Sequence, residues 1–292
     1  MHWKKVTLVG VGLLGGSLGM ALRRQRLADA VVGFVRRHAS VKECEGLGAV
    51  DIATRDLERA VTGADLVVFC TPLAQMRPLA KRLLPWIRRG AIVTDVGSVK
   101  AGVARDLEPL VARAGGFFIG SHPMAGSEKT GVAAARADLF ADAVCVVTPT
   151  PDSNRPALRK VEHLWKSVGS RLLRLTPEAH DELVSRSSHL PYVLAATLAN
   201  FVLSSEHPRQ QGLLCANGFR DTTRIASGSP EMWRDIVLAN RENLARAIER
   251  LAGDLGAFRR ALKRGDARAI EAFFEDAKQR RDRWRERAGA AT

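Results

Sequence analysis

Two short polar segments in the first half of the chain combine side chains suited to acid–base chemistry with a position suited to a ligand site. Residues 94–100 read T-D-V-G-S-V-K, and residues 120–129 read G-S-H-P-M-A-G-S-E-K. Each segment directly follows a short apolar run that is typical of a buried strand. Doubly wound α/β folds bind ligands at the carboxyl ends of such strands, and a neutral imidazole is a suitable base near pH 7. We therefore treat both segments as candidate catalytic loops.

A glycine-rich segment near the N-terminus indicates a nucleotide site. Residues 6–15 read V-T-L-V-G-V-G-L-L-G, a G-x-G-x-x-G that follows a strand-like run and opens a helix. In this context Gly10 permits a tight turn, Gly12 lets backbone N–H groups approach a pyrophosphate, and Gly15 brings the helix against the sheet. The positive N-terminal end of that helix would face the phosphates. We therefore expect NAD or NADP to bind here.

The residues after the second expected strand should select between the two cofactors. A carboxylate there would bond the ribose 2′-hydroxyl of NAD, but this chain has Arg36 and Arg37. Guanidinium groups suit a 2′-phosphate by charge and by bidentate geometry, so we favour NADP. The alternative is that both arginines are ordinary surface residues and that either cofactor is accepted. The other residues assigned to the cofactor site are Leu13, Leu14, Thr71, Pro72 and Ser98.

The elements that must position these loops change character once along the chain. The first part alternates apolar runs with amphipathic stretches such as 76–87 and 99–114, which predicts a parallel sheet covered by helices on both faces. From residue 178 to residue 287 the pattern is helical only. We expect a Rossmann-type α/β domain over residues 1–176 and an all-helical domain over residues 177–292. The expected strands are 6–9, 30–35, 66–70, 91–94, 117–120, 143–147 and 171–175.

Two further polar segments, S-H-L-P-Y at 188–192 and G-F-R-D-T-T-R-I-A at 218–226, lie in the helical part. With the first two segments, and in this order and spacing, they resemble the prephenate/arogenate dehydrogenase family of tyrosine biosynthesis. The resemblance implies an NAD(P)-dependent oxidative decarboxylation. Hydride leaves C4 of the substrate ring for the nicotinamide, the C4 hydroxyl becomes a carbonyl, and carbon dioxide departs as the ring becomes aromatic. It also implies a homodimer whose helical domains pair.

The resemblance assigns roles to individual residues. His122 matches the family's catalytic histidine, which draws off the hydroxyl proton, and Ser98 matches the residue that hydrogen-bonds the reacting hydroxyl and orients the histidine. Arg224 matches a substrate-binding arginine, which suits a substrate with two carboxylates. Glu128 matches an acid near the substrate entrance. The remaining residues expected to bind or support the substrate are His180, His189, Tyr192 and Asp221.

One departure from the family concerns Tyr192, the single tyrosine of the chain. Some members have a histidine at this position, where it helps to hold the substrate. A phenol can donate a hydrogen bond but stays neutral where a histidine could be charged. The choice between prephenate, with a keto-acid side chain, and arogenate, with an amino-acid side chain, therefore stays open.

Two other functions fit parts of the sequence. One is another two-domain NAD(P)-dependent oxidoreductase acting on a hydroxy acid or an imine, but such enzymes typically use a lysine of the helical domain, and residues 180–246 contain none. The other is a catalytically silent NADP-binding sensor, which the presence of both Ser98 and His122 disfavours. We therefore expect an active dehydrogenase.

The composition bounds the class of protein. The chain has 292 residues, 46% of them hydrophobic and 26% charged, as in a globular protein with a sizeable core. The net charge of +14 indicates a basic surface that attracts anions, and acidic residues interrupt its densest stretch, so we expect no nucleic-acid partner. No apolar run reaches the roughly 20 residues of a membrane span. Four widely spaced cysteines indicate no metal site and a reducing, cytoplasmic location.

Overall fold

The computed structural model describes residues 2–126 and 129–289. Of these, the residues up to Arg241 form one compact unit, and those from Glu242 onward form a second. The predicted order, an α/β part followed by a helical part, is confirmed. Among the described helices, none is both long enough and apolar enough to cross a membrane.

The first unit is built on an eight-stranded sheet in the order β3-β2-β1-β4-β5-β6-β7-β8. The first six positions repeat the strand order of nucleotide-binding doubly wound folds. All seven predicted strands are present, with ends shifted by up to three residues. The strands are β1 (Trp3–Val9), β2 (Ala28–Phe34), β3 (Ile52–Thr54), β4 (Leu66–Phe69), β5 (Ile92–Asp95), β6 (Phe117–Pro123), β7 (Val144–Thr148) and β8 (Arg171–Arg174).

Two features of the sheet differ from the prediction. Sequence patterns missed β3, because a strand of three residues leaves too little periodicity to detect. The sheet is also not wholly parallel, since β7 runs antiparallel to β6. Among the described residues between these strands, only one short 3₁₀ turn, η2 (Val132–Ala134), is found in place of a crossover helix. A parallel connection needs such a crossover, whereas an antiparallel one does not.

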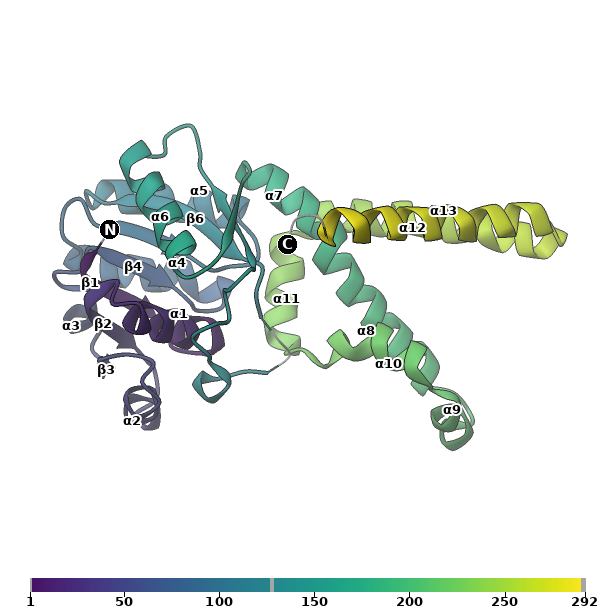
Figure 1. The fold of residues 1–292 in the computed structure, drawn as a ribbon, viewed down its shortest axis with the longest axis horizontal. Helices are drawn as coiled ribbons and strands as arrows, with labels where there is room; N and C mark the ends of the chain where they lie inside the picture. The colour runs from purple at the N-terminus through teal and green to yellow at the C-terminus, as the bar shows by residue number, and fades with distance from the viewer. Residues whose placement is uncertain (1, 127–128, 290–292) are drawn as a thin grey trace. The chain divides into compact units, whose positions relative to one another are not determined.

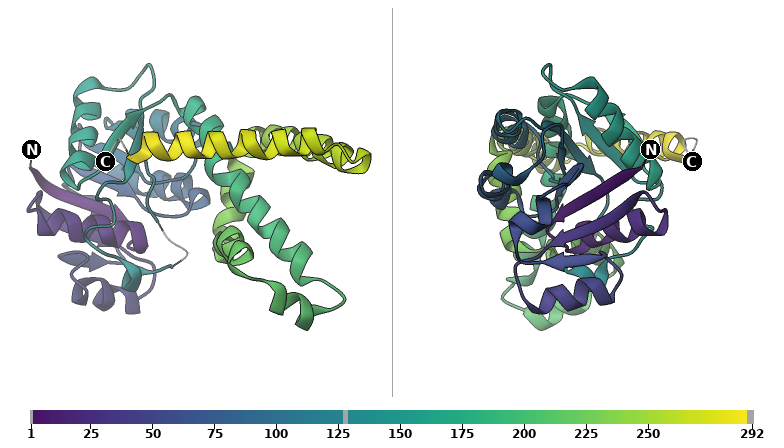
Figure 2. Two further views of the ribbon diagram at one scale, coloured as in Figure 1. Left: turned by 45° about the vertical axis from the view of Figure 1, so that its right-hand side comes forward. Right: turned by 90° about the vertical axis from the view of Figure 1, so that its left-hand side faces the viewer.

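Helices cover both faces of the sheet (Figure 1, Figure 2). Buried side chains of α1 and α6 pack on one face, and those of α3, α4 and α5 pack on the other. Each face of the sheet therefore has its own hydrophobic core. Successive side chains of β4 point to opposite faces, so Leu66 and Val68 lie in one core and Val67 and Phe69 lie in the other. The helices of this part are α1 (Leu13–Arg24), α2 (Ala39–Gly46), α3 (Leu57–Val61), α4 (Leu73–Leu83), η1 (Leu84–Trp86), α5 (Ala101–Arg113) and α6 (Arg155–Ser167).

The remaining chain of the first unit is helical and contacts the α/β part at several places. Helix α7 packs against α5 and β7, and α11 packs against α4. Between α7 and α8 the chain forms one π-helical turn, η3 (Ser185–His189), a rare conformation that is frequent at functional sites. These elements are α7 (Pro177–Val184), α8 (Leu190–Leu203), α9 (Pro208–Leu214), α10 (Asn217–Thr223), η4 (Arg224–Ser227) and α11 (Pro230–Ala239).

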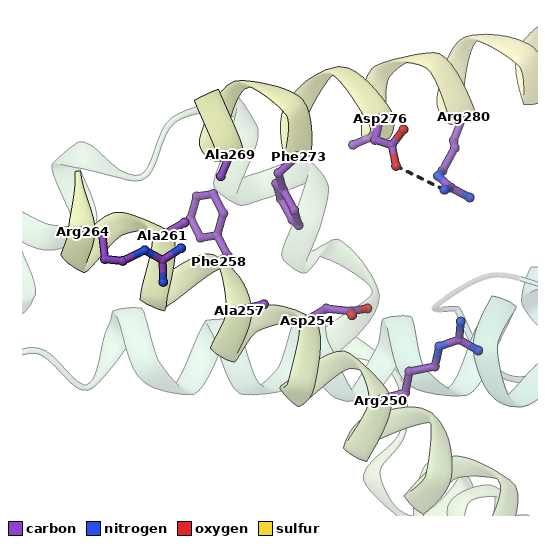
Figure 3. A pocket seen from close by; sticks show the side chains of 11 residues that line it. Arg250, Asp254, Ala257, Phe258, Ala261, Arg264, Ala269, Phe273, Asp276 and Arg280 are labelled. Carbon is purple, nitrogen blue, oxygen red and sulfur yellow. Dashed lines mark hydrogen bonds and ion pairs between the residues drawn. The ribbon is translucent and has the colours of Figure 1, made fainter. Parts of the chain in front are cut away.

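The second unit is a helical hairpin of α12 (Arg241–Arg264) and α13 (Ala267–Gly289). Gly265, with φ of +64°, makes the turn between them. Phe258 of α12 packs against Phe273 and Phe274 of α13, with ring centroids 4.8 and 5.6 Å away. Figure 3 shows the groove between the two helices, with aromatic rings at one end and charged side chains along its rim. The hairpin therefore has an aromatic centre of its own.

The packing of α1 on the sheet leads to a testable requirement for glycine. A Cβ added at Gly19 would lie 1.9 Å from the carbonyl oxygen of Ala49, which is backbone and cannot move aside cheaply. We expect Gly19→Ala to lower the free energy of unfolding by about 1–3 kcal/mol, the usual cost of overpacking. Chemical denaturation monitored by circular dichroism measures the change.

Gly46 provides the matched control, because a Cβ there would meet nothing within 4 Å among the described residues. Gly46→Ala should be neutral or stabilising by up to about 1 kcal/mol, as alanine is the better helix former. Equal destabilisation by the two substitutions would contradict the packing described for α1.

Candidate active site

The glycine-rich loop after β1 has the local geometry of a phosphate-binding turn. Gly10 has φ of +99°, a left-handed conformation that favours glycine. A Cβ on Gly15 would lie 2.1 Å from the Gly10 carbonyl oxygen, so the helix can approach this closely only with glycine. In contrast, no described atom would lie within 4 Å of a Cβ on Gly12, the N-cap residue of α1. The first N–H groups of α1 are thus open to an anion.

Thr71 and Pro72 lie beside this loop, because Val9 of β1 pairs in parallel with Phe69 of β4 and both strands end there. The Thr71 methyl group would lie 2.9 Å from a Cβ on Gly10. The Thr71 hydroxyl is buried and has no hydrogen-bond partner among the described residues. Since buried hydroxyls are usually paired, the free hydroxyl fits a polar ligand at this loop.

Arg36 and Arg37 follow β2, whose end lies beside the end of β1 through the pairing of Val9 with Phe34. Both arginine side chains are exposed. Their strand therefore ends next to the glycine loop, at the edge of the sheet where the sequence places the cofactor ribose. Leu13 and Leu14, in the first turn of α1, are half-buried.

A fully buried ion pair within the first candidate catalytic loop also contacts the second. The Nζ of Lys100 contacts a carboxylate oxygen of Asp95 and donates to the Ser121 carbonyl oxygen at 2.8 Å. Asp95 also accepts from the backbone N–H of Gly97 at 2.8 Å. Neither charged side chain is exposed to solvent. Because removing one partner would leave an uncompensated buried charge, the pair fixes how the ends of β5 and β6 meet.

His122 lies near the end of β6 and is 8% exposed. Its Nδ1 is 2.8 Å from Nε2 of His180, and the two rings meet edge to face at 71°. Burial lowers the pKa of His122 well below 6.5, and His180, Lys100 and His189 lower it further because each disfavours another positive charge. His122 is therefore neutral at pH 7 and able to accept a proton.

Asp181 connects this histidine pair to the sheet. The Nδ1 of His180 is 2.8 Å from Oδ1 of Asp181. The backbone N–H of Lys100 donates to the same oxygen at 2.7 Å, and that of Ala101 donates to Oδ2 at 2.9 Å. Asp181 thus stabilises the N-terminus of α5, where a negative charge is favourable. One carboxylate holds α7 against α5 and orients His180.

His189 is fully buried in the π-helical turn η3. Its Nδ1 is 3.2 Å from the side-chain nitrogen of Asn240, which also donates to the Asp181 carbonyl oxygen at 2.7 Å. Burial, with a contribution from His180, lowers the pKa of His189 to about 4, against the opposing influence of Asp181 and of the Ser98 backbone. Because the amide nitrogen donates to Nδ1, the neutral ring carries its proton on Nε2. That nitrogen has no hydrogen-bond partner among the described residues.

Tyr192 is 9% exposed and stacks on Trp233 with ring centroids 3.7 Å apart and an angle of 11°. Its hydroxyl donates to the Gly228 carbonyl oxygen at 3.5 Å. The same Trp233 ring meets His189 edge to face at 6.2 Å. Tyr192 and Trp233 therefore form an aromatic wall that joins α8 to α11 beside the buried His189.

The other predicted substrate residues lie in different surroundings. Arg224 begins η4 and Asp221 lies in α10, and both side chains are exposed, unlike the buried cluster around His122. The turn η4 packs against α8, the helix that carries Tyr192. Ser98 is half-buried between β5 and α5. Glu128 lies outside the described residues.

Sequence reasoning assigned no role to four residues that the fold brings into this cluster. Asp95 and Lys100 stood within a quoted motif, and their charges, five residues apart after an apolar strand, were an available signal. Asp181 directly follows His180, so the pair was also visible. Asn240 ends α11 and lies 59 residues from Asp181, whose carbonyl it contacts. No sequence feature indicates that contact.

Comparisons with known proteins agree with this geometry. Residues 18–174 match the family profile described as prephenate dehydrogenase, nucleotide-binding domain, and residues 176–276 match the profile described as prephenate dehydrogenase, dimerization domain. A prephenate dehydrogenase of Bacillus subtilis is 33% identical over 280 residues, which cover 95% of this chain and 75% of that protein.

Two solved structures are similar over nearly the whole chain. The Aquifex aeolicus prephenate dehydrogenase in complex with hydroxyphenyl propionate and NAD+ is 32% identical with a TM-score of 0.90, covering 96% of this chain and 98% of the other. The Synechocystis arogenate dehydrogenase is 29% identical with a TM-score of 0.82, covering 96% and 99%.

The lowered pKa of His189 predicts a pH dependence of stability. The unfolded chain protonates this histidine near pH 6.5, whereas the folded protein resists protonation down to about pH 4. Its contribution to stability is therefore complete above pH 6.5 and is lost as the pH falls from 6.5 towards 4. The slope contributed by one histidine is up to about 1.4 kcal/mol per pH unit.

We expect His189→Asn, which does not titrate, to show a shallower dependence of unfolding free energy on pH over this window than the wild type. Urea denaturation at several pH values from 7 to 5 measures both slopes, and His207→Asn, at an exposed position, is the matched control. Identical slopes for His189→Asn and the wild type would rule out this role for His189.

Proposed function

The chain belongs to the prephenate dehydrogenase family, and from that premise we propose how its residues carry out the reaction. The protein is an NAD(P)-dependent oxidoreductase that catalyses the oxidative decarboxylation of prephenate or arogenate. The observation on which this assignment rests is that His122, near the end of β6, is a buried and neutral imidazole. When bound, the nicotinamide supplies the acceptor for the hydride.

We propose that His122 accepts the proton of the substrate hydroxyl. Removing that proton as the C–H bond breaks lowers the barrier, because the oxygen becomes a carbonyl. The lowered pKa of His122 keeps the ring in its basic form at neutral pH. Ser98, on the neighbouring loop, hydrogen-bonds the same hydroxyl and orients it toward the imidazole.

The substrate's charged and polar groups require partners of their own. His189 presents a buried Nε2–H close to the Ser98 backbone, and this N–H suits an acceptor oxygen of the substrate. Arg224 binds a substrate carboxylate, and Asp221 orients that arginine. From the family resemblance we assign to Glu128 a response to the charge of the substrate side chain. Tyr192 presents a neutral aromatic wall to the substrate, since its ring stacks on Trp233.

The residues at the glycine loop fit a dinucleotide. Gly12 leaves the N-terminus of α1 open, and the Thr71 hydroxyl is buried without a described partner. We propose that Gly10, Gly12 and Gly15 hold the pyrophosphate with Leu13 and Leu14, and that Pro72 and Ser98 border the cofactor. Arg36 and Arg37, with no acid between β2 and α2, favour the 2′-phosphate of NADP.

We also propose that two copies pair through the helical part. Its residues 176–276 match a dimerization domain profile, and α8 and α9 expose large apolar side chains, among them Phe201 at 79% and Leu213 at 88%.

We keep the domain boundary at residue 176, supported by the limits of the two family matches. The compact units divide later, after Arg241, because helices such as α7 and α11 pack on the α/β part. Four free thiols support a reducing, cytoplasmic compartment.

The reaction is tested by mixing the protein with prephenate or arogenate and with NADP or NAD, and by following the reduced cofactor by absorbance. We expect turnover in at least one of the four mixtures. His122→Asn should lower kcat by about 100- to 10,000-fold, the usual contribution of a general base. His163→Asn, an exposed histidine on α6, is the control and should retain turnover. Full activity of His122→Asn would refute the assignment of the base.

The cofactor preference is tested separately by the double substitution Arg36→Gln and Arg37→Gln. Loss of charged hydrogen bonds to a 2′-phosphate should raise KM for NADP by about 10- to 100-fold and leave KM for NAD nearly unchanged. Arg159→Gln with Lys160→Gln removes the same number of exposed charges from α6 and controls for net charge. An unchanged KM for NADP, or a wild-type preference for NAD, would show that the arginines do not select the cofactor.

A further inference from the structure

Three side chains from two elements form a hydrogen-bonded series that ends at the proposed base. Asp181 and His180 come from α7, and His122 comes from β6. Each successive contact is 2.8 Å: Asp181 Oδ1 to His180 Nδ1, and His180 Nε2 to His122 Nδ1. His180 is fully buried, Asp181 is 3% exposed and His122 is 8% exposed. Water therefore has little access to compete for these contacts.

The backbone at the start of α5 determines the direction of the first hydrogen bond. Both carboxylate oxygens of Asp181 accept backbone N–H groups, from Lys100 on Oδ1 and from Ala101 on Oδ2. An ionised carboxylate can only accept hydrogen bonds. Nδ1 of His180 must therefore carry a proton and donate it to Asp181.

That direction determines the tautomer of the base. A neutral His180 with its proton on Nδ1 has a lone pair on Nε2, so Nε2 accepts. The facing Nδ1 of His122 must then carry a proton and donate it to His180. The lone pair of His122 is thus left on Nε2, which is the nitrogen able to take a proton from a substrate.

We propose that Asp181 and His180 are positioning residues that hold His122 in its Nδ1–H tautomer and favour the imidazolium formed during the reaction. The inference rests on the proposed function of His122 as the base and extends it. In the step, the substrate O–H bond breaks and its proton forms an N–H bond at Nε2 of His122. His122 keeps its Nδ1 proton, so His180 and Asp181 exchange none.

The charged and titratable groups around His122 explain why such support is needed. His180 faces it from α7, Lys100 from the start of α5 and His189 from η3, and positive charge on any of these groups disfavours a positive ring at His122. In the proposed series His180 instead presents a lone pair to Nδ1–H of His122. The charge of Lys100 is balanced by Asp95, with which it pairs. Asp181 acts through His180, so the positive charge formed at His122 polarises a hydrogen bond that ends on a carboxylate. The series thus compensates in part for the burial that keeps the base neutral.

His180 is the residue to change, because Asp181 also holds α7 against α5 and its replacement would disturb that packing. His180→Leu removes the acceptor for His122 Nδ1–H, whereas His180→Gln can both accept from His122 and donate to Asp181. We expect kcat to fall about 10- to 100-fold in His180→Leu, within the range that a general base contributes. His180→Gln should recover most of the loss. His163→Leu, on the exposed face of α6, should match the wild type.

A second measurement reports the tautomer without turnover. In the full chain labelled with 15N-histidine, long-range 1H–15N spectra distinguish Nδ1–H from Nε2–H rings, and His122→Asn assigns the signal of the base. We expect the Nδ1–H form in the wild type and in His180→Gln, and a mixture of forms in His180→Leu. An Nε2–H ring in the wild type would overturn the proposal, and so would equal loss of kcat in both His180 variants with the tautomer unchanged.

The two readouts also separate this inference from the function on which it rests. If no substrate is turned over but the wild-type ring is Nδ1–H and becomes mixed in His180→Leu, the series stands and the assigned reaction fails. If turnover is normal and the ring is Nε2–H, the reaction stands and the series fails.

Discussion

The carboxylate of Asp181 is the contact on which the geometry of the site depends. It lies on α7 yet accepts hydrogen bonds from the first residues of α5 and from His180. The helix that begins the helical part is thereby held to the α/β part at the point where the proposed base emerges from β6. Asn240, from the end of α11, donates to the Asp181 backbone carbonyl and so brings a third element to the same place. A small error in any of these elements would displace the imidazole.

Burial has opposite consequences for the two kinds of ionisable group in this site. The imidazoles of His122 and His189 remain neutral, because desolvation lowers their pKa values. Lys100 and Asp95 instead face each other with no exposure, and additional backbone partners satisfy them. A buried pair of this kind contributes little net stability, but breaking it is costly, so it specifies one arrangement of the two loops. The neutral imidazoles and the charged pair are parts of one packed cluster.

The cofactor end and the chemical end are linked through the sheet itself. Val9, Phe34 and Phe69 are paired in register, so the loops after β1, β2 and β4 begin side by side. The ends of β5 and β6 are brought together by Lys100, at the start of α5, which pairs with Asp95 of β5 and donates to the Ser121 carbonyl of β6. A parallel arrangement thus brings residues separated by more than 100 positions to one edge. The aromatic wall of Tyr192 and Trp233 is contributed by the helical part of the same unit.

The sequence by itself determined the order of elements, the glycine loop and the identity of the candidate base, because these are written in local patterns. Apolar runs predicted seven strands, and the spacing of Gly10, Gly12 and Gly15 predicted the nucleotide site. Only the tertiary structure decided the antiparallel pairing of β7, the short strand β3, and the contacts of Asp181 with α5 and of Asn240 with α7. These depend on which distant segments meet, and residue type and local spacing carry no such information. The tautomer of His122 belongs to the same class, because a partner 58 residues away fixes it.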